Sequence, residues 1–219
     1  MTTEEYKAQF NEDEAVGWLA IDKPLEQLYP NQEPQHYAPN LHFIAGGTEP
    51  LDGISVYKSD KQEPHFHYVT YGFSDLYYNP EQAGKDFSKY GFELTFRLKK
   101  KSDDDNVTWA CNLMQNLAKY VFKSGKWFEE YHVIPANGPI RLDYDTDIVA
   151  VAFVLDPELG EIDTPNGHVQ FLQMVGLTSA EFDAFKTNPT LGETEKIINL
   201  LRDGNTLLIT DLDRKTSVL

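Results

Sequence analysis

Cysteine is nearly absent from this 219-residue sequence, in which Cys111 is the only one. No disulfide can form within the chain, which favours a reducing compartment. No hydrophobic segment of the secretion-signal type follows Met1. The longest apolar run, residues 148–155, is far shorter than the roughly 20 residues of a membrane helix. These absences predict a cytoplasmic protein without a membrane span.

Basic residues are also scarce, with 19 lysines and arginines against 35 acidic residues and a formal net charge of -16. Binding to nucleic acid depends on lysine and arginine side chains that displace counterions from phosphates. Anionic membrane surfaces repel an acidic chain for the same reason. The charge therefore argues against nucleic acid and membranes as partners. It favours a basic protein partner, or serves only to keep the chain in solution.

Helix signals occur along the whole chain, and 41% of the residues are hydrophobic, which is enough for a packed core. Thr2 and Glu5 have the spacing of a capping box, which predicts an N-terminal helix. A second helix is expected from residue 16 and should stop before Pro24, because proline disfavours helical geometry in the residue before it. Further helices are predicted at residues 109–123, after the capping pair Thr178 and Glu181, and at residues 193–202.

Short runs of β-branched and aromatic residues predict strands. These runs are residues 41–44, 54–57, 65–71, 148–155, 169–175 and 206–210. Between residues 92 and 98, apolar side chains alternate with Glu93, Thr95 and Arg97, which predicts a half-buried strand with one polar face. Strands and helices do not alternate regularly, so we expect an α+β fold in which a mixed or antiparallel sheet packs with helices. No repeat or linker interrupts the chain, and residues 1–219 are expected to form one domain.

Two histidines, His65 and His67, lie two residues apart in a predicted strand and should point to the same face. They could begin a zinc site, with Glu63, Asp75 or His42 as further ligands. The alternative is a pair of histidines packed beside aromatic residues. A second ligand pair with recognisable spacing is missing from the sequence, so we predict no metal and no cofactor. A metal-dependent enzyme that uses His65 and His67 is kept as an alternative.

Other residue patterns give little support to catalysis. Asp143, Asp145 and Asp147 alternate like the start of a calcium loop, but the required glycine and glutamate are replaced by Ile148 and Val154. These acids suit a basic partner or a solvated rim equally well. Cys111 lies in an apolar helical stretch, which is typical of a core residue and not of a nucleophile. No serine lies in a nucleophile-elbow sequence. We therefore predict no catalytic residue and a non-enzymatic protein.

Aromatic residues are concentrated between residues 68 and 78. The five are Tyr68, Tyr71, Phe73, Tyr77 and Tyr78. Exposed tyrosines are effective binding residues at protein interfaces, whereas buried ones serve the core. This stretch is the most suggestive of binding in the sequence.

Several segments, in order, resemble the suppressor-of-fused family. They are GWLAI at 17–21, LYP at 28–30, GGTEPLDGISVY at 46–57, PHFHYVTYGFSDLY at 64–77, GFELTFRL at 91–98, LMQNLAKYVF at 113–122, FLQMVG at 171–176 and LITD at 208–211. The resemblance spans nearly the whole chain and includes the histidine pair. It implies a suppressor-of-fused-like α/β sandwich in which that pair is structural.

The resemblance also implies a function. Animal members of the family are non-enzymatic regulators that carry a second domain and clamp a transcription-factor peptide between the two domains as an added strand. This chain resembles the first domain, and we expect no second one. Tyr77 falls on a family position used in partner binding, and Asp86 lies near another. The resemblance therefore implies partner binding at these two residues.

Two kinds of protein partner follow from the family. Bacterial single-domain relatives are thought to include immunity proteins that neutralise toxins, and the acidity of this chain suits a basic toxin. The alternative is a regulatory scaffold that binds an endogenous peptide or transcription regulator. A homo-oligomer formed through an exposed strand edge stays open as well.

Overall fold

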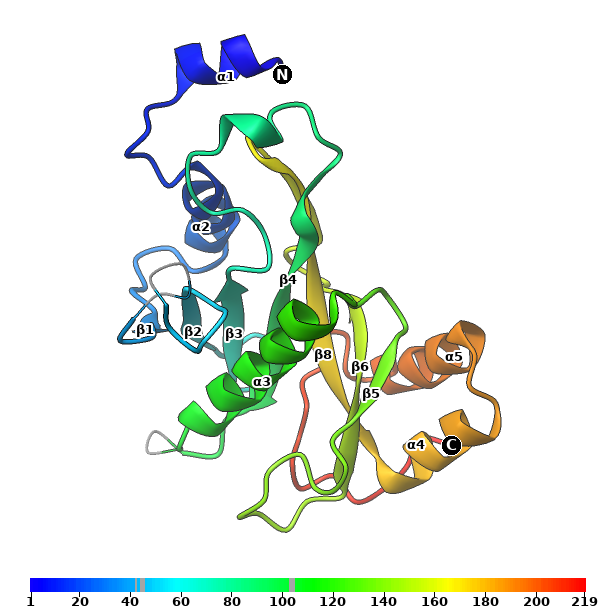
Figure 1. Ribbon diagram of the computed structural model, residues 1–219. Helices are drawn as coiled ribbons and strands as arrows, with labels where there is room; N and C mark the ends of the chain where they lie inside the picture. The colour runs from blue at the N-terminus through cyan, green and yellow to red at the C-terminus, as the bar shows by residue number, and fades with distance from the viewer. Residues whose placement is uncertain (42, 44–45, 103–104) are drawn as a thin grey trace.

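A computed structural model describes residues 1–41, 43, 46–102 and 105–219 of the chain. Its centre is a mixed sheet in which eight strands are described, ordered β1-β2-β3-β4-β8-β6-β5 with β7 also paired to β8 (Figure 1). β4 and β8 run parallel, and the other neighbours are antiparallel. The strands are β1 (Gln35–Tyr37), β2 (Gly53–Ser59), β3 (His65–Tyr71), β4 (Phe87–Lys99), β5 (Val133–Pro135), β6 (Ile148–Leu155), β7 (Glu161–Thr164) and β8 (Gly167–Thr178). The expected α+β class is confirmed.

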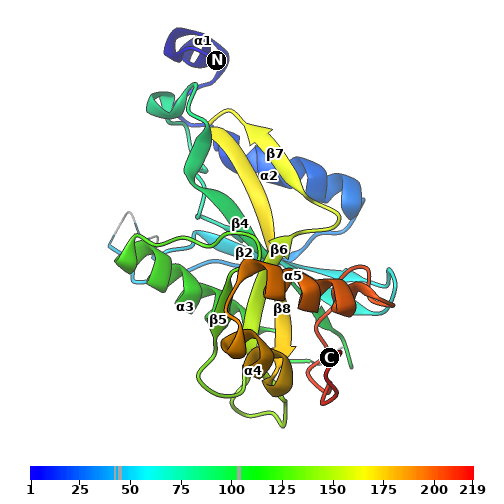
Figure 2. The same cartoon turned by 90° about the vertical axis from the view of Figure 1, so that its right-hand side faces the viewer.

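Helices cover both faces of the sheet (Figures 1 and 2). α3 packs on one face, where its Met114 and Val121 meet β4 and β8. The other face carries α2 beside β3 and α5 beside β6. The helices are α1 (Thr3–Gln9), α2 (Val16–Leu28), α3 (Thr108–Ser124), α4 (Ser179–Thr187) and α5 (Leu191–Arg202), with a 3-10 turn η2 (Pro80–Gln82). None of the helices described combines the length and the apolar character that a membrane span requires.

Most of the long elements lie where the sequence predicts them. β3 and β6 match their predicted bounds, and both capping boxes, at Thr2 and at Thr178, are formed. The predicted strand at 206–210 is wrong, because Thr210 makes a single bridge to Leu98. Residues 42 and 44 of the predicted strand at 41–44, and with them the candidate ligand His42, lie outside the described residues.

The expected helix stop before Pro24 is also wrong, because α2 continues through this proline to Leu28. A proline inside a helix costs about 3 kcal/mol. Ile21 and Leu25 flank it and are both fully buried against the sheet. Burial of two such side chains contributes about 3–6 kcal/mol, which offsets the local cost. Tertiary packing overrides the local signal here.

The polar face of the central strand is buried, which corrects the expectation of a half-buried strand. Glu93, Thr95 and Arg97 on β4 all have a relative exposure of 0%. Their face is covered because α2 and the segment after β6 pack over it, while α3 covers the apolar face. Buried polar groups must find partners inside the protein. The partners of these three residues organise the candidate site.

Candidate functional site

The aromatic stretch between residues 68 and 78 divides into a core part and a surface part. Tyr68, Tyr71 and Phe73 are fully buried, whereas Tyr77 is 45% exposed. Tyr77 lies in the loop that joins β3 to β4, between Gly72 and Asp86. Tyr77 is therefore the most exposed of the five aromatics.

Asn166 fixes the loop that carries Tyr77. This side chain is fully buried, and its Nδ2 donates to the carbonyl oxygens of Asp75 and Tyr77 at 2.8 and 2.9 Å. The hydroxyl of Tyr6 donates to Asn166 Oδ1 at 2.6 Å and accepts the N–H of Asn79 at 3.1 Å. Both ends of the exposed segment are thus held by one buried polar cluster.

The start of α2 closes against the same loop. The N–H of Gly17 donates to the carbonyl of Leu76 at 2.9 Å, and the N–H of Tyr78 donates to the carbonyl of Glu14 at 3.0 Å. A Cβ at Gly17 would lie 2.0 Å from the carbonyl oxygen of Asp75. The approach of helix to loop therefore requires glycine at this position.

Glu93 supports the turn that leads into the loop. Its carboxylate accepts the N–H groups of Gly72 and Ser74, both at 2.9 Å, and the hydroxyls of Thr70 and Ser74 at 2.7 and 2.6 Å. Burial raises the pKa of Glu93. The Lys89 ammonium donates to the carbonyl of Gly72 at 2.5 Å from the other side. The turn is fixed by interactions with both a carboxyl group and an ammonium group.

The electrostatic setting of Tyr77 is acidic. Partial burial and then the nearby Asp52 carboxylate raise the pKa of the Tyr77 hydroxyl. The phenol stays neutral at physiological pH and can donate a hydrogen bond.

Asp86, the second candidate, is exposed and immediately precedes β4. Its carbonyl accepts the N–H of His168 on β8 at 3.0 Å. Gly167 has a φ of +110°, and a Cβ there would lie 2.7 Å from the backbone of Phe87. The turn at Asn166 and Gly167 therefore touches the Tyr77 loop on one side and the Asp86–Phe87 backbone on the other. The segments that carry the two candidates therefore both contact this turn.

His168 adds a charged group beside this turn. Its Nδ1 lies 3.0 Å from Asp163 and its Nε2 lies 3.3 Å from Glu161, so both ring nitrogens face carboxylates of β7. The hydrogen bond with Asp163, together with that of Glu161, raises the pKa of His168. The ring also lies 6.0 Å from the ring of Phe87, which is 57% exposed.

Both histidines of β3 are buried away from this surface, and His67 belongs to a buried polar network. Arg97 and Asp156 form two hydrogen bonds at 2.6 and 3.1 Å. His67 Nε2 lies 3.2 Å from Asp156, and His67 Nδ1 lies 2.7 Å from the Tyr29 hydroxyl. Burial and the Arg97 charge lower the pKa of His67 to about 4. The neutral ring therefore donates from Nε2 to the carboxylate and accepts from Tyr29 at Nδ1.

Asp156 stays ionised although it is buried. Burial alone opposes its charge, but hydrogen bonding from His67 and the Arg97 charge hold its pKa well below the usual range. Arg97 also donates to Glu158 at 2.9 Å and to Oε1 of Gln173. The Nε2 of Gln173 in turn donates to the carbonyl of Leu207 at 2.8 Å. The network ties the sheet to the segment after α5.

Among the described residues, the candidate zinc ligands Glu63 and Asp75 do not converge on this pair. His65 Nδ1 lies 2.7 Å from the carbonyl of Glu63, whose carboxylate pairs with Lys99 at 2.9 Å. Asp75 lies beyond the opposite end of β3. Within the part of the chain that the structure describes, no group of three or more potential ligands could hold a metal ion.

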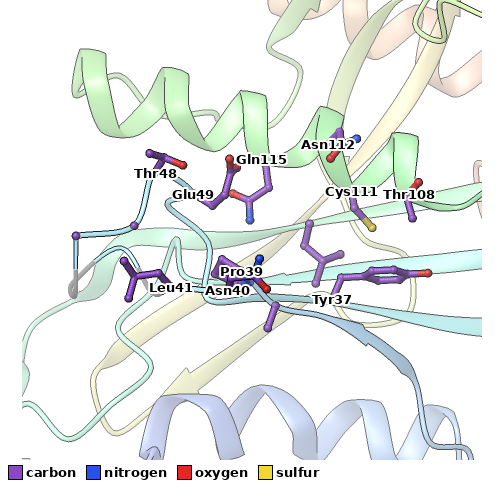
Figure 3. A pocket seen from close by; sticks show the side chains of 14 residues that line it. Tyr37, Pro39, Asn40, Leu41, Thr48, Glu49, Thr108, Cys111, Asn112 and Gln115 are labelled. Carbon is purple, nitrogen blue, oxygen red and sulfur yellow. The ribbon is translucent and has the colours of Figure 1, made fainter.

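A cavity of about 610 Å³ lies between α3 and the segments at 37–41 and 46–49 (Figure 3). Cys111 lines it, but burial raises the pKa of this thiol to about 12, which is far from that of a reactive thiolate. Glu49 pairs with Lys119 at 2.8 Å, and Gln115 accepts the N–H of Leu51 at 3.3 Å. The described lining residues include no histidine that could take the thiol proton. The prediction of Cys111 as a buried residue is confirmed.

The three alternating aspartates lie in the loop before β6 and at its edge, not on one strand face. Asp145 pairs with Lys215 at 2.6 Å, and Asp147 accepts the Ser179 hydroxyl at 3.0 Å. Two of the three carboxylates are therefore used within the chain.

Sequence reasoning missed the residues that hold the site together, above all Asn166, Gly167 and His168. One signal was available, because Asn-Gly between two strand-like segments is a strong hairpin signal. It marks the β7–β8 hairpin. The contacts of Asn166 with Tyr6 and Tyr77 span 160 and 89 residues of sequence, so no local pattern encodes them.

Comparisons with known proteins find related sequences and structures. The family model described as Suppressor of fused protein (SUFU) matches residues 47–215. The Suppressor of fused homologs of Homo sapiens and Mus musculus are each 33% identical over 213 residues, which is 92% of this chain. The chain spans 44% of the length of these relatives.

Solved structures give the same result. The crystal structure of the Sufu-Fu complex matches with a TM-score of 0.83 and 32% identity, covering 93% of each chain. Drosophila Suppressor of Fused matches with a TM-score of 0.80 and 32% identity, covering 93% of this chain and 51% of that one. A putative SUFU homolog from Neisseria gonorrhoeae FA 1090 shares the fold, with a TM-score of 0.63 at 15% identity over 93% of this chain and 97% of that one.

Proposed function

Because this chain belongs to the suppressor-of-fused family, we propose that it acts by binding a protein partner, as one domain spanning residues 1–219, and not by catalysis. One observation carries the proposal: Tyr77 is 45% exposed on a loop whose carbonyls and amides are fixed by buried groups. A rigid, exposed aromatic loses little entropy when it is covered, and such residues dominate binding energy at interfaces.

The binding surface that we propose contains Tyr77 and Asp86. The turn at Asn166 and Gly167 contacts the backbone on both sides, which supports a single continuous surface. The carboxylates of Asp52 and Asp86 give this surface an acidic character, in line with the net charge of -16. A basic partner would be attracted to it over long range.

Two partner classes are supported by different observations. The charge supports a basic toxin that the chain neutralises as an immunity protein, and this is the first candidate. The crystal structure of the Sufu-Fu complex supports the second, because a chain of similar length to this one occurs there in a protein complex. That candidate is a regulatory scaffold for an endogenous peptide or transcription regulator.

Affinity capture from the native organism tests the proposal. Tagged wild type, Tyr77→Ala and the control Leu142→Ala are compared by quantitative mass spectrometry. Leu142 is 87% exposed in the loop between β5 and β6, at the other end of the molecule from the Tyr77 loop (Figure 1). We expect a specific partner whose affinity falls at least about tenfold in Tyr77→Ala and is unchanged in the control.

The identity of the captured protein separates the two classes. A toxin encoded beside the gene, together with protection of cells that express this chain, supports the immunity role. An endogenous peptide or a transcription regulator supports the scaffold role. Equal capture by wild type and Tyr77→Ala contradicts the proposed surface, and capture of no specific protein contradicts the binding function.

A further inference from the structure

We propose that a pocket between Phe87 and Trp127 receives an apolar side chain of a partner segment that is otherwise rich in lysine and arginine. This inference rests on the proposed binding function and names the chemistry of the partner. The pocket has a volume of about 500 Å³. Phe87 and Trp127 are 57% and 55% exposed, which is unusual for side chains of this size.

The pocket exists because α3 is shorter than the sheet that it covers. The helix ends at Ser124, and Gly125 caps it with a φ of 69°. Beyond this point the chain turns through Trp127, and none of the described helices lies over the start of β4 and of β8 on this face (Figure 1). Phe92 and Phe128 are almost fully buried and line the pocket. A partner side chain would therefore meet aromatic surface on several sides.

Trp127 is held in place although its ring is exposed. Its Nε1 donates to the Glu129 carboxylate at 3.1 Å. Phe128, the next residue, stacks on Phe153 with ring centroids 4.3 Å apart, which fixes the backbone to the sheet. A ring whose position is fixed in the free protein loses little entropy on binding.

The pocket is continuous with the proposed surface around Tyr77. Lys89 lines the pocket, and its ammonium donates to the carbonyl of Gly72, at the start of the Tyr77 loop. Phe87 follows Asp86 directly in the chain. One partner segment could therefore contact Asp86 while it fills the pocket.

Charged side chains surround the rim of the pocket. Glu129 lines the pocket, and Glu161 contacts the pocket residue Gln170 at 3.5 Å. Asp163 bonds to His168, which lies beside Phe87. Two cationic groups contact this rim: His168 bonds to Asp163 and lies 3.3 Å from Glu161, and the Lys89 ammonium is engaged by the Gly72 carbonyl and lies 4.4 Å from the Phe122 ring. Exposed Lys85 and Lys126 precede Asp86 and Trp127 in the chain, so the preference for a basic segment rests on the net charge of -16 together with the rim.

A second copy of the chain fits this pocket poorly. Each copy has a net charge of -16, so two copies repel each other, and the acidic rim would face another acidic surface. A segment with an apolar residue between lysines or arginines satisfies both the aromatic pocket and the rim.

Two variants test the pocket in the full chain. Phe87→Ala and Trp127→Ala remove exposed side chains, so both should fold with an unchanged melting temperature. Their affinity for the partner captured by wild type is measured beside Tyr77→Ala and Leu142→Ala. We expect Phe87→Ala and Trp127→Ala each to weaken binding at least about tenfold. Weakening in Tyr77→Ala alone overturns the pocket and leaves the proposed function standing.

A synthetic probe tests the pocket independently of the partner. The probe is a capped nine-residue peptide with a central phenylalanine between lysines and arginines, and its controls carry a central serine or glutamate flanks. The chain has three tryptophans, so its indole N–H signals are few, and Trp127→Phe assigns the relevant one. We expect the basic phenylalanine peptide to shift the Trp127 signal, and both controls to shift it at least about tenfold less at equal concentration.

Three outcomes overturn the inference. The first is equal shifts with all peptides, and the second is no shift up to millimolar peptide. The third is a concentration-dependent dimer, seen by light scattering, that Trp127→Ala dissociates, because a second copy would then cover the pocket. Binding to the partner that depends on Tyr77 would remain unaffected in each case.

Discussion

Asn166 and Tyr77 are 89 residues apart in the sequence, yet the Asn166 side-chain amide donates to the Tyr77 carbonyl at 2.9 Å. This bond is one of three that the fully buried side chain makes, the others being with Asp75 and Tyr6. A buried amide of this kind sets the position of an exposed side chain without touching a partner itself. It therefore acts as a positioning residue for the proposed surface.

Replacement of Asn166 by alanine leaves two carbonyls and one hydroxyl without their partner. We expect Asn166→Ala to lower the free energy of unfolding by about 2–4 kcal/mol, because unpaired buried polar groups are costly. Urea unfolding measures the change. Asn199→Ala, at an exposed position of α5, is the matched control and should change stability by less than about 0.5 kcal/mol. Equal effects of the two variants would contradict the role of Asn166.

The glycine at the start of α2 gives a second prediction. A Cβ at Gly17 would lie 2.0 Å from the Asp75 carbonyl oxygen, whereas one at Gly192 on α5 meets nothing within 4 Å. We expect Gly17→Ala to destabilise the fold by about 2–4 kcal/mol through displacement of the loop. Gly192→Ala should be neutral or stabilise by up to about 1 kcal/mol, since alanine favours a helix. Thermal melts of both variants check this, and a neutral Gly17→Ala would show that the loop adjusts freely.

Asn166 and Gly17 also show which parts of the site can be predicted from the sequence and which cannot. Local signals located β3, β6, α3 and the two capping boxes, because periodicity and caps act within a few residues. The alternation in β4 identified a polar face, but burial of that face depends on α2, which is distant in the sequence. Likewise Tyr77 was found from its neighbours and from a family resemblance. Asn166 and Gly17 were not, because their roles arise only from contacts formed in the fold.

The buried pair of Arg97 and Asp156 gives a third prediction. Both side chains have 0% exposure, so loss of one partner leaves the other with a buried, unpaired charge. We expect Asp156→Asn to cost about 3–5 kcal/mol of stability. The control is Lys61→Ala. The Lys61 side chain pairs with Glu158 and is 64% exposed, so its loss should cost less than about 1 kcal/mol of stability. Chemical denaturation of both variants tests the difference, and a mild Asp156→Asn would mean that water reaches Arg97.

His67 predicts a loss of stability in acid. Its pKa is lowered from 6.5 to about 4 in the folded protein. Between these values the unfolded chain binds a proton at this site that the folded chain does not, so stability falls as the pH falls from 6.5 towards 4. This difference between the unfolded and folded pKa values corresponds to a loss of free energy of unfolding on the order of 3 kcal/mol. In His67→Gln the decline across this window should be smaller by that amount, measured by urea unfolding at several pH values. An unchanged slope would show that folding does not lower the pKa of His67.

His168, at the proposed surface, should change stability with pH in the opposite direction from His67. Its folded pKa is raised above 6.5, first by the hydrogen bond with Asp163 and also by that with Glu161. The folded chain therefore holds this proton more tightly than the unfolded chain. The resulting stabilisation is fully present below pH 6.5 and is lost as the pH rises through the folded value.

An NMR titration of the His168 ring measures this pKa directly. We expect a value above 6.5 in wild type and a fall towards 6.5 in the double variant Glu161→Gln, Asp163→Asn, which keeps the shape of both side chains and removes their charge. A pKa that does not change in the double variant would show that the two carboxylates do not hold the ring. Because the His168 ring lies 6.0 Å from that of Phe87, its charge also enters the field at the pocket. Loss of that positive charge above the folded pKa leaves the rim more acidic, so a basic segment should bind more tightly at higher pH, provided that its lysines and arginines remain charged.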